Sequence, residues 1–429
     1  MKKIFMWSLV LLISIAMFTM FSLTGVAKKD ITLTYMTSHG WIFDAEMNVL
    51  AEKFTEETGI KVDFQVVPAD QYPNLLTTKI NSGECTDIFG SQSGRFDIVT
   101  RLNVEKNAVD LSGEAWTGTM DENAAVEVSV NGKIYGQPMA DVSNVWAIAY
   151  NKKIFSDLGL TIPKTWAEFT AVCDKIMESG ITPIYGPVSD GWHHVLWFAE
   201  MGPAYEKAEP GLVDRLNSNQ SKFADSAVMK TAIEQIKEMV DKGYWGKNYM
   251  ADSLADAPMK ISSGEFAMVV YNQVFSQEVV ERGEGLGVDD IGYFLIPIVD
   301  NQILNVNYGC PTRYIYSGSE NIEAAKMYLE FIARPENLQY LIDNVAEYKT
   351  LPYSGLTPEL PDPVKEFYDT YTEKGQVLQK AVKYLEPQWM EMGKELVNVI
   401  LGKQDATKML ENIDKNREDQ ATAAKDPAW

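Results

Sequence analysis

The first part of the chain alternates between short runs rich in β-branched residues and longer amphipathic segments. Residues 31–36 (ITLTYM) and 61–67 (KVDFQVV) have the composition and the alternation that are typical of strands. Residues 44–58, which lie between these two runs, carry apolar side chains at helical spacing. Residues 71–80, which follow the second run, show the same pattern. A short apolar run over residues 87–90 predicts a buried strand. Strands that alternate with helices predict a parallel sheet that is covered on both faces.

Helical patterns are more frequent in the rest of the chain. Thr165 and Glu168 stand at the spacing of a capping box and predict that a helix begins just after Pro163. The same patterns predict strands over residues 134–138, 145–150, 266–271 and 291–298, and helices over residues 224–242, 322–345 and 384–401. The polar tail over residues 412–429 predicts a frayed helix.

The N-terminus has the form of an export signal. Lys2 and Lys3 precede an uncharged apolar run, and the small residues Gly25, Val26 and Ala27 stand where a signal peptidase cleaves. The run is also long enough to cross a bilayer, at about 20 residues, so a retained anchor is an alternative. No cysteine lies near Ala27, so a lipid-anchored start is not expected. We therefore expect an exported protein that is periplasmic or associated with the cell surface.

The charge of the chain argues against nucleic acid as a partner. The chain has 60 acidic and 38 basic side chains and a net charge of −22, and the predicted signal removes only positive charges. Nucleic acid is bound through clusters of Lys and Arg, which this composition does not favour. The charges are spread along the sequence and are typical of a solvated surface. A length of 429 residues exceeds one compact core and predicts two domains.

The three cysteines do not predict a disulfide framework or a metal site. Cys85, Cys173 and Cys310 are far apart in the sequence, and their number is odd. No CxxC spacing is present. We therefore expect buried, small apolar residues. An exported protein could still pair two of them, and the sequence does not say which two.

Five stretches of the mature chain resemble one known family, in the order in which that family has them. They are FTEETGIKVDFQVV (54–67), KIYGQP (133–138), AYNKKIFSDLGLTIPKTWAEF (149–169), ISSGEFAMVVYN (261–272) and EAAKMYLEFIARPENLQYLI (323–342). These stretches are similar to family 1 of the extracellular solute-binding proteins, the sugar-binding components of bacterial ABC importers. Together they cover nearly the whole mature chain.

The resemblance implies a periplasmic-binding-protein-like fold of type 2, in which two α/β lobes are joined by a hinge and enclose a ligand cleft. It implies a monomer that binds a carbohydrate, and the many tryptophans favour an oligosaccharide. Such a protein delivers its ligand to the permease subunits of an ABC transporter in the membrane, without catalysis and without a cofactor. The expected parts are a signal peptide (1–27), a first lobe (28–140), a second lobe (141–272), a return segment of the first lobe (273–312), and the second lobe with C-terminal helices (313–429).

A sugar site needs flat aromatic rings for the C–H faces and fixed polar groups for the hydroxyls. In such folds the ligand lies at the carboxyl ends of the strands. In the first lobe, Ser38, His39 and Trp41 follow the first predicted strand, and Gln92 follows the strand over residues 87–90. Asp141 follows the segment that crosses between the lobes, where a carboxylate could accept hydrogen bonds from two neighbouring hydroxyls. We expect these five side chains to contact the ligand.

In the second lobe, the stretch SDGWHHVLW (189–197) combines two histidines with two tryptophans. Asp190, Trp192 and His193 are expected to open a helix that faces the cleft, with Trp192 as a stacking ring. Adjacent residues on a helix point about 100° apart, so His193 and His194 are poorly placed to bind one metal ion. A metal site that joins His39 to one of them remains an alternative. The other expected ligand contacts in this part of the chain are Asn272, Tyr308, Arg313 and Trp389.

Two other functions remain open from the sequence. A secreted glycoside hydrolase would need two carboxylates on either side of one glycosidic bond, and 60 acidic residues leave many possible pairs. No carboxylate stands in a motif that indicates catalysis, however. The same fold could also bind a polyamine, which suits acidic residues and aromatic walls through cation–π contacts.

Overall fold

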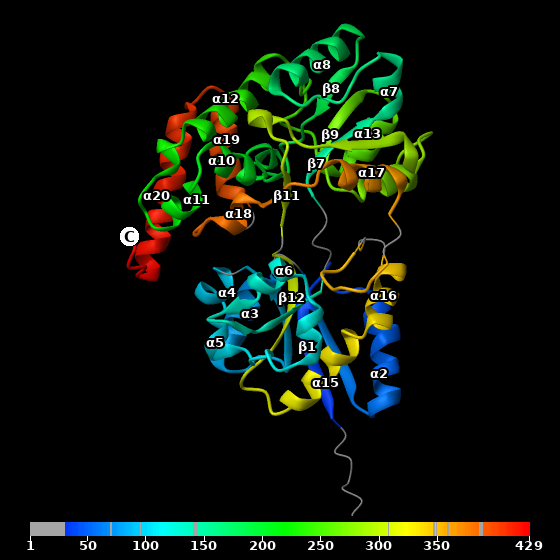
Figure 1. The fold of residues 1–429 in the computed structure, drawn as a ribbon, viewed down its shortest axis with the longest axis vertical. Helices are drawn as coiled ribbons and strands as arrows, with labels where there is room; N and C mark the ends of the chain where they lie inside the picture. Colours follow the sequence, from blue (N-terminus) through cyan, green and yellow to red (C-terminus); the bar gives the residue numbers. More distant parts are fainter. Residues whose placement is uncertain are drawn as a thin grey trace, which may run out of the picture.

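The computed structural model describes residues 31–68, 71–94, 96–139, 145–307, 309–345, 348, 350–357, 360–385 and 389–429. These residues form two lobes, which lie one above the other in Figure 1. The first lobe consists of residues 31–139 and 309–357, and the second consists of residues 145–307 and 360–429, each within the described ranges. The expected signal peptide lies outside the described residues.

The first lobe is built on a five-stranded sheet with the order β2-β1-β3-β12-β6. Its strands are β1 (Thr32–Ser38), β2 (Lys61–Val67), β3 (Ile88–Gln92), β6 (Gly136–Pro138) and β12 (Pro311–Ile315). β2, β1 and β3 are parallel, as the alternation of strands and helices predicts, and β12 runs antiparallel to both β3 and β6. The carboxyl ends of β1 and β3 therefore lie at the same edge of the sheet.

Helices cover both faces of this sheet. Because side chains alternate along each strand, each strand presents apolar residues to both faces. Leu33 and Tyr35 belong to one buried cluster, and Met36 belongs to the other. The first cluster includes residues of α2 (Ala51–Thr58), α15 (Ile322–Ile332) and α16 (Pro335–Asn344), and the second includes residues of α3 (Tyr72–Ser82). The helix predicted over residues 44–58 is a π-helical segment, Ala45–Leu50, followed by α2.

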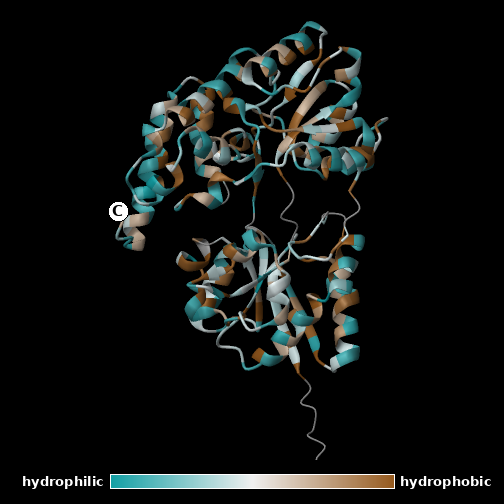
Figure 2. Ribbon diagram, viewed as in Figure 1, coloured by the Kyte–Doolittle hydropathy of each residue, from teal (hydrophilic) through white to brown (hydrophobic). Residues whose placement is uncertain are grey.

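The second lobe contains a four-stranded sheet with the order β10-β7-β9-β8. Its strands are β7 (Ala147–Asn151), β8 (Thr182–Tyr185), β9 (Phe266–Tyr271) and β10 (Ile291–Phe294). β7 runs antiparallel to both β9 and β10, whereas β8 and β9 are parallel. All six residues of β9 are buried, in agreement with its continuous apolar sequence. Figure 2 shows hydrophobic residues along the strands of both lobes and many hydrophilic residues on the surrounding helices.

The helices of the second lobe confirm one prediction and correct another. Thr165 caps α8 (Trp166–Glu178) in a capping box with Glu168, as the sequence predicts. The C-terminal tail over residues 412–429 is not a frayed helix: most of it belongs to α20, which spans Ala406–Ala424 and buries Ile413 and Ala421 within the lobe. The apolar positions of α20 recur at helical spacing and pack against α19 (Met390–Ile400).

Strand pairing corrects the expected lobe boundaries after residue 272. Residues 273–307 belong to the second lobe, because β10 pairs with β7 there. Residues 309–345 belong to the first lobe, because β12 pairs with β3 and the helices that follow pack on the same sheet. The chain therefore passes between the lobes three times: between residues 139 and 145, between 307 and 309, and between 357 and 360.

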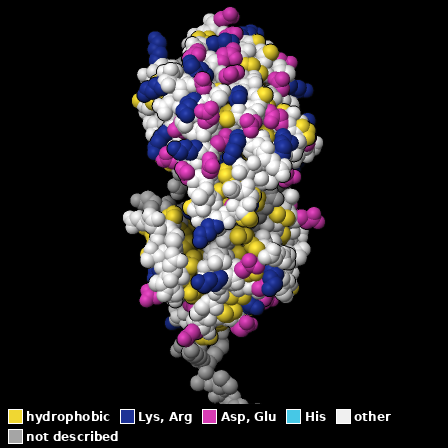
Figure 3. Space-filling model, turned by 90° about the vertical axis from the view of Figure 1, so that its left-hand side faces the viewer, with side chains coloured by type: hydrophobic (Ala, Val, Ile, Leu, Met, Phe, Trp, Pro, Cys, Tyr) yellow, Lys and Arg dark blue, Asp and Glu magenta, His cyan; other side chains and the backbone are white. Residues whose placement is uncertain are grey.

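The surface of the second lobe mixes both signs of charge. Figure 3 shows acidic and basic side chains interspersed over the face that it displays. No helix within the described ranges is both long enough and apolar enough to cross a membrane.

Candidate functional site

A cavity of about 500 Å³, which we call the interlobe cavity, is lined by residues of both lobes. The carboxyl ends of β1 and β3 lead directly into it, so the sheet of the first lobe positions part of its wall. The residues of the first lobe that line it include Ser38, Trp41, Tyr72 and Gln92, and those of the second lobe include Trp146, Trp192, Glu200, Lys380 and Trp389.

Each lobe contributes a pair of aromatic rings to the walls of this cavity. In the first lobe, Trp41 and Tyr72 lie edge to face, with ring centroids 5.6 Å apart and planes at 78°. In the second lobe, Trp146 and Trp192 lie 5.7 Å apart with planes at 70°. Edge-to-face packing fixes the direction of each ring. Trp41, Trp146 and Trp192 are partly exposed and can offer a face to an apolar surface, whereas Tyr72 is buried and supports Trp41. Aromatic walls on both lobes suit a ligand that presents flat C–H faces on two sides.

A buried carboxyl group lies beside these rings. Glu200 follows the short helix α9 (Leu196–Ala199), and its carboxyl accepts a hydrogen bond of 2.6 Å from the side-chain amide of Asn305. Burial raises the pKa of Glu200 to about 8, although the hydrogen bond from Asn305 opposes this shift. At neutral pH the group is therefore mostly protonated, and it can both donate and accept a hydrogen bond.

A buried lysine connects the two lobes next to the cavity. Lys380 lies on α18 (Leu378–Ala381) of the second lobe, and its Nζ donates a hydrogen bond of 3.0 Å to the backbone oxygen of Ser93 in the first lobe. Its side chain passes so close to Gly309 that a Cβ at that position would lie 2.4 Å from Cε of the lysine. The absence of a side chain at residue 309 therefore leaves the space that Lys380 occupies.

A second hydrogen bond between the lobes is made by a residue of a strand in the second lobe. Gln376 ends β13 (Lys374–Gln376), which pairs in parallel with β11 (Leu304–Val306). Its side-chain amide donates to the carboxylate of Glu127 in the first lobe at 3.0 Å. Two long polar side chains of the second lobe thus reach across to the first.

Five of the ligand contacts expected from the sequence lie together in the interlobe cavity: Ser38, Trp41, Gln92, Trp192 and Trp389. Ser38 and Gln92 lie at the ends of parallel strands. Trp192 and Trp389 come from segments far apart in the sequence. The rule that ligands lie at the carboxyl ends of strands selected Ser38, Trp41 and Gln92, and the fold brings these three residues to one place.

The structure contradicts the expectation that Arg313 contacts the ligand. Arg313 is buried within the first lobe, where its guanidinium forms an ion pair with Glu46. Its Nη1 also lies 3.4 Å from the side-chain oxygen of Gln137, and the hydroxyl of Tyr328 donates to Glu46 at 2.9 Å. Arg313 points into this network because side chains alternate along β12, so it stabilises the lobe and does not line the cavity.

Asp190 and His193 also differ from the prediction, because both make bonds within the second lobe. The carboxylate of Asp190 accepts hydrogen bonds from the backbone nitrogen of Leu254 at 2.6 Å and from the hydroxyl of Ser253 at 3.0 Å. His193 is fully buried, and its Nε2 lies 2.8 Å from the backbone oxygen of Val270. Burial lowers the pKa of His193 to about 4. Neither side chain lines the interlobe cavity.

The histidines do not assemble a metal site. His194 is buried, its Nε2 lies 3.0 Å from the backbone oxygen of Gly393, and burial lowers its pKa. His39 is exposed on the first lobe, so the structure does not bring it to the buried pair. Within the part of the chain that the structure describes, no group of three or more His, Cys, Asp or Glu side chains is placed to hold a metal ion.

The remaining expected contacts lie elsewhere or outside the described residues. His39 does not line the interlobe cavity, and neither does Asn272, whose side-chain oxygen accepts a hydrogen bond of 3.2 Å from the backbone nitrogen of Val274. Asp141 and Tyr308 lie outside the described residues.

Several residues of the cavity were missed from the sequence. Trp146 lies within the apolar run over residues 145–150 that was predicted as a strand, and Lys380 stands in a segment without a strong pattern. Glu200 had a usable signal, because it is the one charged residue in the apolar stretch VLWFAEMGPA (195–204). A charged residue in such a stretch is buried at a cost unless it has a specific partner or a function.

Comparison with known proteins agrees with this geometry. A family model described as bacterial extracellular solute-binding protein matches residues 42–339. The multiple sugar-binding protein of Streptococcus mutans is 23% identical over 323 residues, which are 74% of this chain and 74% of that protein. A solved chitin oligosaccharide binding protein has a TM-score of 0.74 at 20% identity and covers 91% of this chain and 98% of its own.

A structure of RafE in complex with raffinose is also similar, with a TM-score of 0.69 at 18% identity over 90% of this chain and 98% of that one. These likenesses confirm the two-lobed, periplasmic-binding-protein-like fold that was expected from the sequence.

Proposed function

Because the chain belongs to the family of bacterial extracellular solute-binding proteins, we propose that it binds a neutral oligosaccharide in the interlobe cavity and delivers it to an ABC importer. The observation that carries this proposal is the presence of paired aromatic rings on both lobes, Trp41 with Tyr72 and Trp146 with Trp192. A sugar ring between such walls can stack its C–H faces while its hydroxyls meet polar groups at the edges.

The charges of the cavity favour a neutral ligand over a polyamine. Among the described residues that line it, Glu200 is the only one with a carboxyl group, and its raised pKa keeps that group mostly neutral at pH 7. Lys380 and Arg101 line the same cavity. Among the described lining residues a polycation would therefore meet little negative charge, which disfavours its binding.

The carboxyl groups that line the cavity also argue against hydrolysis of the sugar. A glycosidase places two carboxyl groups about 5–10 Å apart across the bond that it cleaves. Only Glu200 is available among the described lining residues, and it has no carboxylate partner there. We propose that the protein is a receptor that releases its sugar unchanged.

Ligand binding would favour a closed arrangement of the lobes. A sugar that touches both aromatic pairs gains contacts only when the lobes are close together, so it shifts the population toward that state. Lys380 and Gln376 of the second lobe bond to Ser93 and Glu127 of the first. These hydrogen bonds would keep the two lobes aligned during this motion. The partners in this proposal are the permease subunits in the membrane, which would receive the sugar from a monomeric, exported protein.

Thermal shift and titration calorimetry on the mature protein test the proposal. The probes are gluco-, xylo-, manno- and N-acetylglucosamine oligosaccharides, with putrescine and spermidine for comparison. A sugar at 100 times its dissociation constant should stabilise the folded state by about 2.7 kcal/mol. The sugar is then recovered by heat denaturation of the protein, and we expect it to be intact.

A matched pair of variants connects the binding to the cavity. Trp192→Ala should weaken sugar binding by about tenfold or more, because it removes one stacking ring. Tyr340→Ala removes a partly exposed ring on α16, away from the cavity, and should leave the affinity unchanged. Equal affinities for the wild type and Trp192→Ala would contradict the proposed site. A shorter sugar in the recovered sample, or a response to the polyamines alone, would replace the proposed function.

A further inference from the structure

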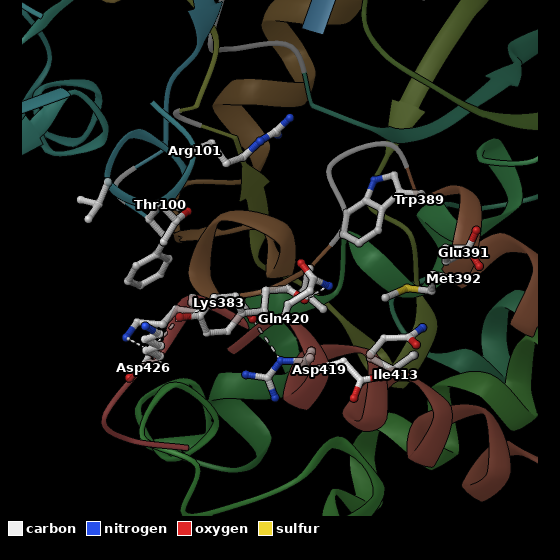
Figure 4. Close-up of a pocket in the computed structure, with 18 of the residues that line it drawn as sticks. Thr100, Arg101, Lys383, Trp389, Glu391, Met392, Ile413, Asp419, Gln420 and Asp426 are labelled. Carbon is white, nitrogen blue, oxygen red and sulfur yellow. Dashed lines mark hydrogen bonds and ion pairs between the residues drawn. The ribbon is translucent and has the colours of Figure 1, made fainter. Parts of the chain in front are cut away.

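A second cavity adjoins the interlobe cavity. Its volume is about 1180 Å³, and we call it the outer cavity. Arg101 of the first lobe and Trp389 of the second line both cavities, so the two spaces meet at these side chains. Figure 4 shows Arg101 and Trp389 on one side of the outer cavity, Ile413 and Asp419 on the opposite side, and Gln420 between them.

Both lobes build the outer cavity, as they build the interlobe cavity. Val99 and Thr100 of the short helix α4 (Asp97–Thr100) belong to the first lobe. From the second lobe, α20 contributes Ile413, Asn416 and Gln420. These three positions recur at the spacing of three and four residues that defines one face of a helix. One face of α20 therefore forms a continuous wall of the outer cavity.

The wall combines apolar surface with neutral polar groups. Val99 is 46% exposed, a high value for an aliphatic side chain, and Ile413 faces the same space from α20. The side-chain amides of Asn416 and Gln420 are exposed beside them. Amides donate and accept hydrogen bonds without a net charge, which suits hydroxyl groups.

The charged side chains around the outer cavity nearly cancel. Arg101, Lys383, Arg417 and Lys425 line it together with Glu391, Asp419 and Asp426. Lys383 and Asp426 form an ion pair of 3.1 Å, and the hydroxyl of Tyr384 donates to Asp426 at 2.9 Å. A cavity with this balance does not select a strongly charged ligand.

Trp389, which separates the two cavities, has an uncommon backbone conformation. Its φ is 60° and its ψ is 6°, in the left-handed region, where a bulky residue is rarely found. Such conformations concentrate at ligand-binding and active sites, where the surrounding structure holds them. The tryptophan precedes α19 and is almost completely buried between the cavities.

From this continuity we infer that the outer cavity binds further sugar units of the same oligosaccharide, with Trp389 as the platform between the units in the two cavities. The inference rests on the proposed function. The interlobe cavity alone, at about 500 Å³, has the size of an ordinary small-ligand site, and the outer cavity exceeds that size. The ligand class is therefore an uncharged oligosaccharide that is too long for the interlobe cavity.

The test is a series of chain lengths. Titration calorimetry measures the affinity of cello-, xylo-, chito- and malto-oligosaccharides, each from the monosaccharide to the hexasaccharide. We expect the best series to gain at least tenfold in affinity beyond the length that fills the interlobe cavity, because added units gain hydrogen bonds and apolar contacts.

Two variants of α20 separate the outer cavity from the rest of the protein. Gln420→Trp places a large ring in the outer cavity and should remove the gain for long sugars while the shortest sugar that binds is unaffected. Glu418→Trp adds the same ring at an exposed position of α20 that does not line the cavity, and should retain the gain. Unchanged binding of the short sugar also shows that each variant is folded.

The outcomes distinguish this inference from the proposed function. An affinity that is independent of length, or a gain that persists in Gln420→Trp, would overturn the role of the outer cavity and leave sugar binding intact. The failure of every sugar to bind the wild type would overturn both. The expected result is a gain with length that disappears in Gln420→Trp alone.

Discussion

The side-chain amide of Asn305 donates a hydrogen bond of 2.6 Å to the carboxyl group of Glu200, which lines the interlobe cavity. This pair comes from two segments that are 105 positions apart in the sequence. Among the described residues no cation is paired with Glu200, so burial dominates and raises its pKa to about 8. The protonation state of Glu200 is therefore linked to the stability of the second lobe.

We predict that Glu200 makes the protein less stable as the pH rises from about 4.5 to about 8. In that window the folded state holds a proton that the unfolded state has released, so folding takes up a proton and is opposed by higher pH. The slope from one such group is at most about 1.4 kcal/mol per pH unit. Glu200→Gln resembles the neutral acid and should flatten this part of the pH profile of urea unfolding.

A matched control for Glu200 is Glu418→Gln, at an exposed position of α20. This variant should keep the slope of the wild type. The same slope in Glu200→Gln and in the wild type would contradict the assignment of the buried proton to Glu200.

The buried histidines predict a loss of stability on the acid side. The pKa of His193 is lowered to about 4 by burial, and that of His194 is lowered by burial as well. Between about pH 6.5 and pH 4 the unfolded state binds protons that the folded state does not, so stability falls as the pH falls. His193→Gln should make this fall less steep in urea titrations between pH 4 and 7, whereas His39→Gln, at an exposed position, should not. An equally steep fall in both variants would contradict this origin.

Arg313 is predicted to act on stability and not on sugar affinity. Arg313→Met leaves the carboxylate of Glu46 buried without its ion pair, and the loss of one partner of a buried pair costs about 3–5 kcal/mol. The exposed pair of Lys153 and Asp157 provides the control, since Lys153→Met should cost less than about 1 kcal/mol. Urea unfolding measures both. A large loss of affinity in folded Arg313→Met, measured by calorimetry, would return Arg313 to the binding site.

The sequence predicted local features well because neighbouring residues determine them. The capping box of Thr165 and Glu168, the buried strand Phe266–Tyr271 and the parallel start of the first sheet depend on patterns within a few residues. Trp41 and Trp192 could be predicted as residues of the cavity because each follows a strand, and the ends of strands gather at one edge of each sheet.

Long-range partners were not visible in the sequence. The partner of Arg313 is Glu46, 267 positions away, and no local pattern distinguishes an arginine in a lobe core from one in a ligand site. For the same reason the expected boundary after residue 312 falls inside β12 (Pro311–Ile315), and the part of the strand after that boundary was assigned to the wrong lobe. The wall of α20 was missed because its face is polar where it meets the outer cavity, which resembles a solvated tail in the sequence.

The close approach of Gly309 to Lys380 predicts a coupling between packing and ligand binding. Gly309→Ala would place a Cβ 2.4 Å from Cε of Lys380, so the lysine must move and its hydrogen bond to Ser93 is weakened. Overpacking of this kind costs about 1–3 kcal/mol. Because Lys380 lines the interlobe cavity, sugar affinity should fall together with stability.

Gly113→Ala is the control for this prediction. No atom lies within 4 Å of the added Cβ, so the variant should change neither property. Calorimetry and urea unfolding on both variants measure the coupling, and a loss of stability in Gly309→Ala with full sugar affinity would show that the position of Lys380 does not affect the site.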